Sequence, residues 1–308
     1  MPEKLKLNNP WLVAVWPGMG NVAISAGYYL MAKLGMELFA EFAPAELFDV
    51  EHVDVKEGII QPVERPRSRL FVRHDPDGKR DIVVFIGEAQ PQSGKYAFCH
   101  RLIEFAREHG VERVFTFAAM ATQMHPEHES RVYGATTDEA MLHELQQLEL
   151  VLLEDGHIGG LNGVLLGAAA EAELPGTCLL GEMPHIFLQF PFPKASLAVL
   201  ETFTTIAGIQ LDTSELAEHA RVTDEKLGEI LARVQEAMGH EPPPEEDFSP
   251  EPPEEPQLSP ADERRIEDLF QQAAQNRSQA YELKQELDRL EVFKDYEDRF
   301  LDLFKSSE

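Results

Sequence analysis

The sequence predicts an α/β domain with a mostly parallel sheet flanked by helices, followed by a helical C-terminal extension. Strand-like and helix-like segments alternate over about the first 210 residues, as in folds with a parallel sheet. Several strand candidates are uniformly apolar, which is typical of strands buried on both faces. A proline- and acid-rich stretch then interrupts the pattern. We therefore expect a core over residues 1–213, a helix over 214–239, a linker over 240–260 and an amphipathic helical segment over 261–308.

The first half of the core contains strands and helices with clear boundaries. Residues 11–16 form an apolar strand candidate, residues 21–34 a helix ended by Gly35, and residues 36–42 a second strand. Two β-rich runs flank Asp77-Gly78, a dipeptide favoured in tight hairpin turns. They predict a hairpin whose second run is a central, fully buried strand.

The second half of the core continues the alternation. A helix with one apolar stripe ends at Gly110, and an apolar strand follows at residues 113–120. Thr136 and Glu139 have capping-box spacing and predict a helix that begins there and ends at about residue 148. The remaining elements are strands at 150–156 and 176–182, a helix capped by Asn162, and a helix opened by Pro193.

The C-terminal third has a different composition. Residues 214–238 have a helical pattern, and the linker that follows is rich in proline and acid, which predicts an extended segment. Ser259, Pro260 and Asp262 supply a helix start. The last segment carries an amphipathic stripe that must bury against the chain's own core or against another chain.

Net charge and cysteine use limit the possible functions. The formal charge is −28, and residues 214–308 carry 26 acidic against 11 basic side chains, which excludes nucleic acid and anionic membrane as expected partners. Cys99 and Cys178 are expected to be buried, reduced thiols. No apolar run has the length of a spanning helix and no signal core occurs at the N-terminus. We expect a cytoplasmic protein without a cofactor or a metal site.

A glycine turn follows the first strand. Gly18, Gly20 and Ala23 match the G-x-G-x-x-A spacing of a dinucleotide-binding turn. Pro17 fixes the entry of this turn and Met19 places a bulky apolar side chain at its tip, which favours a tight strand–helix turn that shapes a pocket or a contact surface. Dinucleotide binding and other anion binding stay open as alternatives.

A second glycine cluster, at residues 156–163, precedes a later helix. For this cluster a strained loop that needs positive φ and binds no ligand is favoured over a ligand-binding loop. Because glycine turns after parallel strands lie at the carboxyl edge of a sheet, that edge is the place where a ligand cleft would form. Two carboxylates and a histidine at strand ends are candidates for acid–base work, against the alternative that they cap helices or form ion pairs. His125 and His128, in a loop with Pro126, favour solvated side chains over a zinc site. The predicted cleft comprises Gly18, Met19, Gly20, Asn21, Glu88, Gly160, Asn162, Gly163, Glu182 and His185.

Four segments occur in an order that resembles a known family. They are WPGMGNVAISAGYYL, VYGATTDEAML, GGLNGVLLGAA and CLLGEMPH, and they are similar to segments of the bacterial and archaeal relatives of the second eukaryotic proteasome assembly chaperone. The resemblance spans residues of about 10 to 220. It implies a three-layer α/β/α fold like that of the nucleoside phosphorylases, oligomers built from that domain, and no established catalysis.

The resemblance also implies protein partners. Chaperone members of the family dock on proteasome α-subunits through a C-terminal hydrophobic-Tyr-x ending. The ending Phe304 to Glu308 does not match it, so we do not expect this chain to dock on the proteasome in that way. We therefore expect a non-catalytic, assembly-chaperone-like scaffold that forms a homo-oligomer, a trimer or larger. The alternative is a small-ligand or nucleotide-binding enzyme, ligase- or phosphorylase-like, that uses the cleft. The predicted partner-binding residues are Leu287, Leu290, Phe293, Tyr296, Phe300 and Phe304.

Overall fold

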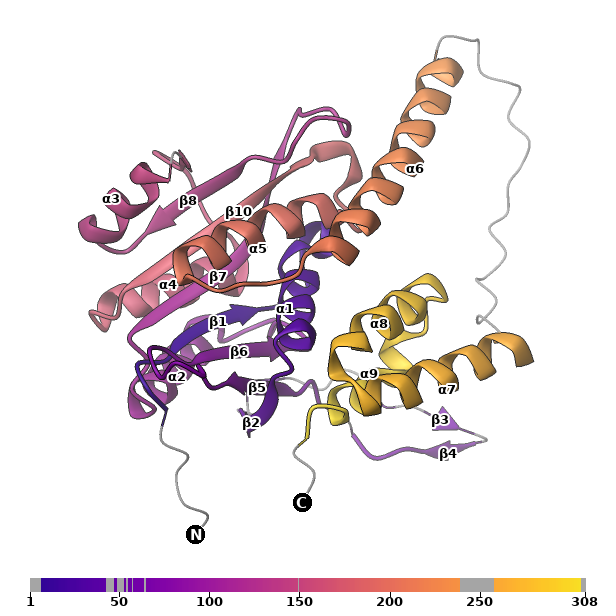
Figure 1. Ribbon diagram of the computed structural model, residues 1–308, viewed down its shortest axis with the longest axis horizontal. Coiled ribbons are helices and arrows are strands. Elements are labelled where there is room, and N and C mark those ends of the chain that lie inside the picture. The colour runs from indigo at the N-terminus through magenta and orange to yellow at the C-terminus, as the bar shows by residue number, and fades with distance from the viewer. Residues whose placement is uncertain are drawn as a thin grey trace.

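The computed structural model describes residues 7–42, 47–48, 53, 55–56, 58–63, 65–148, 150–238 and 258–305. Within them a mixed eight-stranded sheet has the order β2-β5-β6-β1-β7-β10-β8-β9 (Figure 1). The strands are β1 (Trp11–Val15), β2 (Glu37–Glu41), β5 (Ser68–Arg73), β6 (Ile82–Gly87), β7 (Arg113–Thr122), β8 (Val132–Thr136), β9 (Val151–Leu152) and β10 (Gly176–Pro184).

The centre of the sheet is parallel, as predicted. β6, β1, β7 and β10 run in one direction, and the pairs on either side of this group are antiparallel. Every residue of β1, β6 and β10 is buried, which explains why these strands are apolar without alternation. The four central strands therefore place their carboxyl ends along one edge of the sheet.

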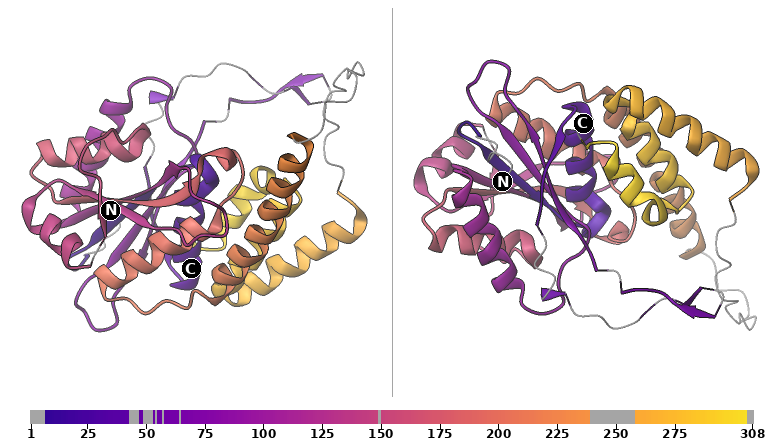
Figure 2. Two further views of the ribbon diagram at one scale, coloured as in Figure 1. Left: turned by 90° about the horizontal axis from the view of Figure 1, so that it is seen from above. Right: turned by 90° about the horizontal axis from the view of Figure 1, so that it is seen from below.

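Helices cover both faces of the sheet and form a three-layer α/β/α fold (Figures 1 and 2). On one face α2 and α4 pack on each other and on the strands; on the other α1 and α5 do so. α3 packs beside β8, and α6 follows α5. The bounds are α1 (Val22–Lys33), α2 (Lys95–Glu108), α3 (Glu139–Gln147), α4 (Gly160–Glu171), α5 (Pro193–Ala207) and α6 (Ser214–Met238).

Three further helices form a C-terminal unit that packs against α1. They are α7 (Pro260–Gln275), α8 (Ala280–Arg289) and α9 (Phe293–Asp302), and they lie beside the β2 and β5 side of the sheet (Figure 1). Ser259 caps α7 by accepting a hydrogen bond from the Asp262 backbone, as predicted. The predicted linker at 240–260 lies almost entirely outside the described residues.

Two local predictions are wrong. The cap of α3 is Asp138, whose carboxylate accepts a hydrogen bond from the Met141 backbone at 2.9 Å. Thr136 is not the cap because it is the last residue of β8, a strand that the sequence analysis did not identify. Asn162 does not cap α4 either: it lies inside the helix, and the residue at the N-cap is Gly159.

A small hairpin stands apart from the main sheet. β3 (Val55–Lys56) and β4 (Ile59–Ile60) pair only with each other. The hairpin extends beyond the sheet and its helices in all three views (Figures 1 and 2). We call the described residues of the segment that carries it, 53, 55–56 and 58–63, the arm. The sequence analysis did not predict it.

Candidate functional site

The first glycine turn packs tightly against a neighbouring segment. Gly20 has φ +59°, and a Cβ there would lie 2.8 Å from the Met183 sulfur. Its backbone nitrogen donates to the Leu188 carbonyl at 3.0 Å and its carbonyl accepts from the Phe192 backbone at 2.9 Å. Gly20 is therefore required for a turn that is tied to the β10–α5 connection. Gly18 is extended and has open space around it, and Met19 is exposed at the tip, as predicted.

Gln90 joins the two glycine turns. Its amide donates to the Pro17 carbonyl at 3.2 Å and accepts from the Leu161 backbone at 3.1 Å. A Cβ at Gly160 would lie 2.8 Å from the Gln90 oxygen, and Gly160 itself has φ +67°. The two turns thus meet at one edge of the sheet, as expected. A side chain that the sequence analysis did not single out bridges them.

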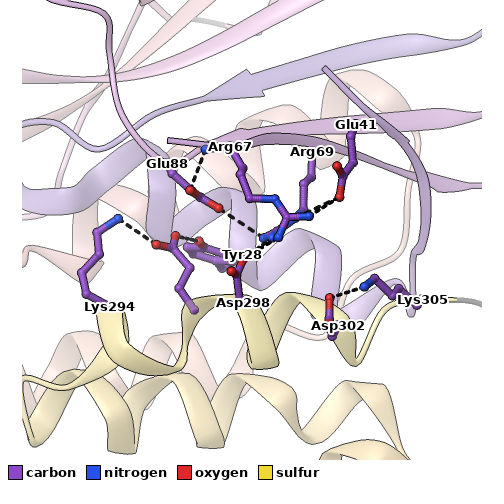
Figure 3. A network of polar contacts seen from close by, with 10 residues as sticks. Tyr28, Glu41, Arg67, Arg69, Glu88, Lys294, Asp298, Asp302 and Lys305 are labelled. Atoms are coloured by element: carbon purple, nitrogen blue, oxygen red, sulfur yellow. Dashed lines mark hydrogen bonds and ion pairs between the residues drawn. The ribbon is translucent and has the colours of Figure 1, made fainter. Parts of the chain in front are cut away.

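Glu88 points toward Arg67 and Arg69, above the helix that carries Asp298 (Figure 3). Its carboxylate accepts from the Arg67 backbone at 2.7 Å and from the Arg69 guanidinium at 3.2 Å. Burial raises the pKa of the Glu88 carboxyl, against the lowering effect of these partners. Of the two roles considered for this carboxylate in the sequence analysis, ion pairing rather than acid–base work matches its contacts.

Glu182 is also paired. It is 2% exposed and accepts two hydrogen bonds from Arg131, each at 2.7 Å, and one from Thr122 at 2.8 Å. The hydrogen bonds from Arg131 hold the pKa of the Glu182 carboxyl below its usual range, so this group is an ionised anchor at neutral pH. His185 contacts the Thr122 carbonyl at 3.0 Å through Nδ1.

The ten predicted cleft residues therefore do not line one cavity. Glu182 borders a hollow of about 440 Å³ that includes His128 and Arg131. Asn21 borders a different and larger groove, and neither cavity includes the other eight. His125 and His128 lie near each other in the loop, with ring centroids 5.8 Å apart. The described residues contain no group of three or more side chains arranged to hold a metal ion.

The larger groove lies between α6 and α8 and has a volume of about 860 Å³. Ser25 and Tyr28 of α1 contribute to its lining, and Phe190 comes from the β10–α5 connection. Leu227 and Ile230 of α6 add apolar surface. The sequence analysis missed this groove because it arises only when the C-terminal unit packs beside α6, a contact between segments far apart in the sequence.

Inside the groove, His219 of α6 contacts the Tyr281 hydroxyl of α8 at 3.1 Å. Burial lowers the pKa of the His219 imidazole. Nearby, Lys284 is 7% exposed and bonds to Asp288, and burial lowers the pKa of its ammonium group. The groove thus combines apolar walls with partly buried polar groups, most of which already have partners in the chain.

The predicted partner-binding stripe contacts the chain's own core. Phe293 and Phe300 pack edge-on against Tyr28, with ring centroids 5.4 and 5.7 Å apart. Phe304 packs against Phe71 at 5.9 Å. Leu287, Phe300 and Phe304 are fully buried, whereas Leu290, Phe293 and Tyr296 are partly buried against the same core. While the helices stay in this position, these side chains are covered, so partner binding through them stays a prediction.

A polar network fixes the C-terminal unit to the core (Figure 3). Tyr28 donates to the buried Glu297 carboxylate at 2.8 Å. Arg69, a β5 residue that is 1% exposed, forms ion pairs with Asp298 of α9 and with Glu88. Arg67 reaches the same Asp298 carboxylate at 3.1 Å. Contacts from two core elements therefore converge on one face of α9.

The cysteines are buried, as expected. Cys99 and Cys178 are both buried and free, and burial raises the pKa of each to about 12. Among the described residues no helix combines the length and apolar character that a bilayer-spanning helix needs.

Comparison with known proteins gives a consistent family match. The PAC2 family matches residues 12–231. An uncharacterized protein of Methanocaldococcus jannaschii is 28% identical over 248 residues, which cover 79% of this chain and 92% of that one.

Solved structures show the same similarity. Pyrococcus furiosus PbaB, an archaeal proteasome activator, is 26% identical, with a TM-score of 0.63 over 76% of this chain and 96% of that one. A PAC2 family protein from Streptomyces avermitilis is 27% identical, with a TM-score of 0.62 over 71% and 95%. Since the family match covers most of the described α/β core, this chain belongs to the PAC2 family.

Proposed function

We propose that this protein is a non-catalytic, assembly-chaperone-like scaffold that binds protein partners and associates with itself. It would cover a surface on an unassembled partner and leave when a larger interface forms there. The observation that carries the proposal is the combination of a PAC2 core with exposed apolar side chains in two regions, the arm and the groove beside α6. Exposed apolar surface of this kind is typical of protein contact sites.

The candidate catalytic groups give little support to the enzyme alternative. Glu182 and Glu88 are tied to arginines, and both thiols are buried with raised pKa values. A nucleophile needs a neighbouring base or a lowered pKa. In the described part of the chain, neither cysteine has this environment.

A capture experiment with defined subunits tests the proposal. The first partner to test is a proteasome subunit, because the similar P. furiosus chain is an archaeal proteasome activator. The full chain is immobilised and exposed to unassembled α-subunits from its own organism or to the assembled particle. We expect retention of the unassembled subunits and release when assembly is completed.

A thermal-shift panel of nucleotides, nucleosides and phosphate tests the alternative in parallel. Stabilisation that grows with ligand concentration, together with turnover of that ligand, would overturn the proposal in favour of an enzyme. Failure to retain proteasome subunits, or any protein from the native organism, would also overturn it.

A further inference from the structure

Three aromatic side chains at the end of the C-terminal unit lie on two rings of the core. Phe293 and Phe300 pack against Tyr28, and Phe304 packs against Phe71. Their spacing of seven and four residues places the three on one stripe of a helix. Proteins commonly bind an amphipathic helix by taking such a stripe onto an apolar surface. The segment that includes α9 is therefore seated on the core as a helical ligand would be.

The charged groups of this contact are complementary. Arg67 and Arg69 of the core both pair with Asp298 of α9, as Figure 3 shows. The Tyr28 hydroxyl donates to the adjacent Glu297 at 2.8 Å. The core thus supplies the donors and α9 supplies two neighbouring carboxylates. We call the core residues of this contact, Tyr28, Arg67, Arg69 and Phe71, the helix-binding face.

Each arginine of the helix-binding face divides its nitrogens between the core and α9. Arg69 donates from Nη1 to Glu88 at 3.2 Å and from Nη2 to Asp298. Arg67 donates from Nη2 to Glu41 and from Nη1 to Asp298 at 3.1 Å. Without α9, each guanidinium therefore keeps one carboxylate partner on the core and has a second nitrogen for a carboxylate from outside.

The carboxylates of α9 are also accommodated when the contact opens. Lys294 pairs with Glu297 at 2.7 Å within the helix, and the Asp298 side chain is 67% exposed even in the closed position. An unpaired buried charge is a large cost of breaking a contact of this kind. Because none of these groups becomes one, α9 can leave the helix-binding face and return to it.

The two sides of the contact belong to different parts of the chain. The helix-binding face lies within residues 12–231, which match the PAC2 family, and α9 lies beyond them. Residues 239–259 connect α6 to α7, and a chain of that length spans at most about 70 Å. The connection is long enough for the C-terminal unit to move off the core and remain attached.

We propose that the helix-binding face is a docking site for an amphipathic helix of a protein partner, and that α9 occupies this site in the isolated chain. The partner helix carries an aromatic stripe and two adjacent carboxylates, as α9 does. The C-terminal unit is then an autoinhibitory cover that the partner helix displaces. The inference rests on the protein binding in the proposed function and names the class of partner and its docking site.

A labelled peptide with the sequence of residues 293–305 is the probe, and the full chain is the receptor. Phe300→Ala with Phe304→Ala weakens the hold of α9 and leaves the helix-binding face intact. We expect fluorescence anisotropy to show that this opened variant binds the peptide at least about tenfold more tightly than the parent, in which the tethered α9 competes. Leu142→Ala with Leu148→Ala, at exposed leucines outside the contact, is the control and should bind as the parent does.

A second peptide, with Glu297→Lys and Asp298→Lys, tests the charge requirement. We expect the opened variant not to bind it. Equal binding of the two peptides, no binding of either, or parent binding as tight as that of the opened variant would overturn the proposal.

A substitution on the core tests where the peptide binds. In the opened variant, Arg67→Glu places a like charge opposite the peptide carboxylates, and we expect at least about a tenfold loss of affinity. Arg73→Glu, at the other end of β5, makes the same charge change and should keep the affinity. Equal affinities for these two variants would place the peptide elsewhere and overturn the assignment.

A cut between α6 and α7 tests the cover without any substitution in the described residues, and it works even where the alanine variant fails to fold. A protease recognition sequence is inserted after Pro244 of the full chain, and the folded protein is cleaved. We expect mass-tagged C-terminal fragments to exchange between cores, as measured by native mass spectrometry. Fragments that stay with their original cores would show that the unit is a permanent part of the core, and would overturn the proposal.

The two proposals fail separately. Retention of proteasome subunits by the full chain, with no peptide binding by the opened variant, removes this inference and leaves the scaffold function in place. Charge-dependent peptide binding at the helix-binding face, with no protein retained in the capture experiment, supports the helix site and removes the chaperone-like function.

Discussion

The two faces of the sheet are closed in different ways. On one face α2 and α4 pack through apolar side chains, with Phe98 against Trp16 and Phe85. On the other face α1 lies between the sheet and the C-terminal unit. That unit is attached by aromatic contacts together with buried charged side chains, such as Arg69 and Glu297.

This difference follows the boundary of the family match. The apolar face is built entirely within residues 12–231, whereas the C-terminal unit lies beyond them. Buried ion pairs add little net stability, yet removal of one partner is costly because it leaves an uncompensated charge. The attachment of the C-terminal unit therefore depends on correctly placed charges more than the packing of α2 and α4 on the other face does.

Cavity-forming substitutions on the two faces give the largest expected effects. Phe98→Ala and Phe300→Ala each remove a fully buried ring, at a cost of about 3–5 kcal/mol in the free energy of unfolding. We expect Phe98→Ala to weaken the whole core and Phe300→Ala to loosen α7–α9 alone. Hydrogen exchange measured by mass spectrometry separates the two. Equal loss of protection in β1 and β6 for both variants would show that core and unit unfold together.

The buried guanidinium gives the next effect. Arg69→Ala removes the guanidinium partner of the Glu88 carboxylate, whose side chain is 14% exposed, and we expect a loss of about 3 kcal/mol in the free energy of unfolding measured with urea. Arg67 is a matched control, because it contacts the same Asp298 carboxylate from a side chain that is 39% exposed. We expect Arg67→Ala to cost about 1 kcal/mol or less. Similar losses for the two variants would mean that burial does not distinguish these ion pairs.

Much of the fold was predictable from the sequence, because the elements that carry it are locally encoded. A few neighbouring residues are enough to identify each of these elements. Examples are the apolar runs of β1 and β6, the glycines Gly35 and Gly110 that follow helices, and the Ser259 cap. β8 was missed because its residues Val132–Thr136 include Gly134 and alternate only weakly. The arm was missed because it has no buried face to impose a pattern.

The candidate site was less predictable for a different reason. The turns around Gly20 and Gly160 were correctly placed at one sheet edge, but Gln90 fills the space between them. β9, the strand before Gly160, is antiparallel to the central strands. The prediction that the second glycine turn directly follows a strand parallel to them was therefore wrong. The groove depends on α6 and α8, whose contact no local pattern encodes.

Removal of a single tyrosine hydroxyl should have a smaller effect on the free energy of unfolding. Tyr28→Phe removes a buried hydrogen bond to the Glu297 carboxylate, and we expect a loss of about 1.5–3 kcal/mol. Tyr29→Phe, its neighbour in α1, removes a bond to the neutral Asp212 carbonyl, for which about 0.5–1.5 kcal/mol is expected. Chemical denaturation of both variants measures the difference. A larger loss of unfolding free energy in Tyr29→Phe than in Tyr28→Phe would contradict the idea that the charge of Glu297 makes its hydrogen bond the stronger one.

The smallest expected effect is a pH dependence at the groove between α6 and α8. Burial lowers the pKa of His219 in the folded chain, with Asp288 opposing and Lys226 and Lys284 reinforcing this change. The unfolded chain therefore binds a proton first as the pH falls below about 6.5. The contribution of His219 is complete above that pH and is lost as the pH falls toward the folded value.

His219→Gln keeps a polar partner for Tyr281 and cannot titrate, so the difference in thermal midpoint between parent and variant should change with pH. We expect the parent to lose stability relative to the variant between about pH 7 and pH 5, while the other histidines and the carboxylates contribute equally to both. His100→Gln, at an exposed site on the apolar-packed α2, serves as the control and should follow the parent. Parallel curves for parent and His219→Gln would mean that this imidazole is solvated when the chain is folded, and that the groove is wider than the contact with Tyr281 indicates.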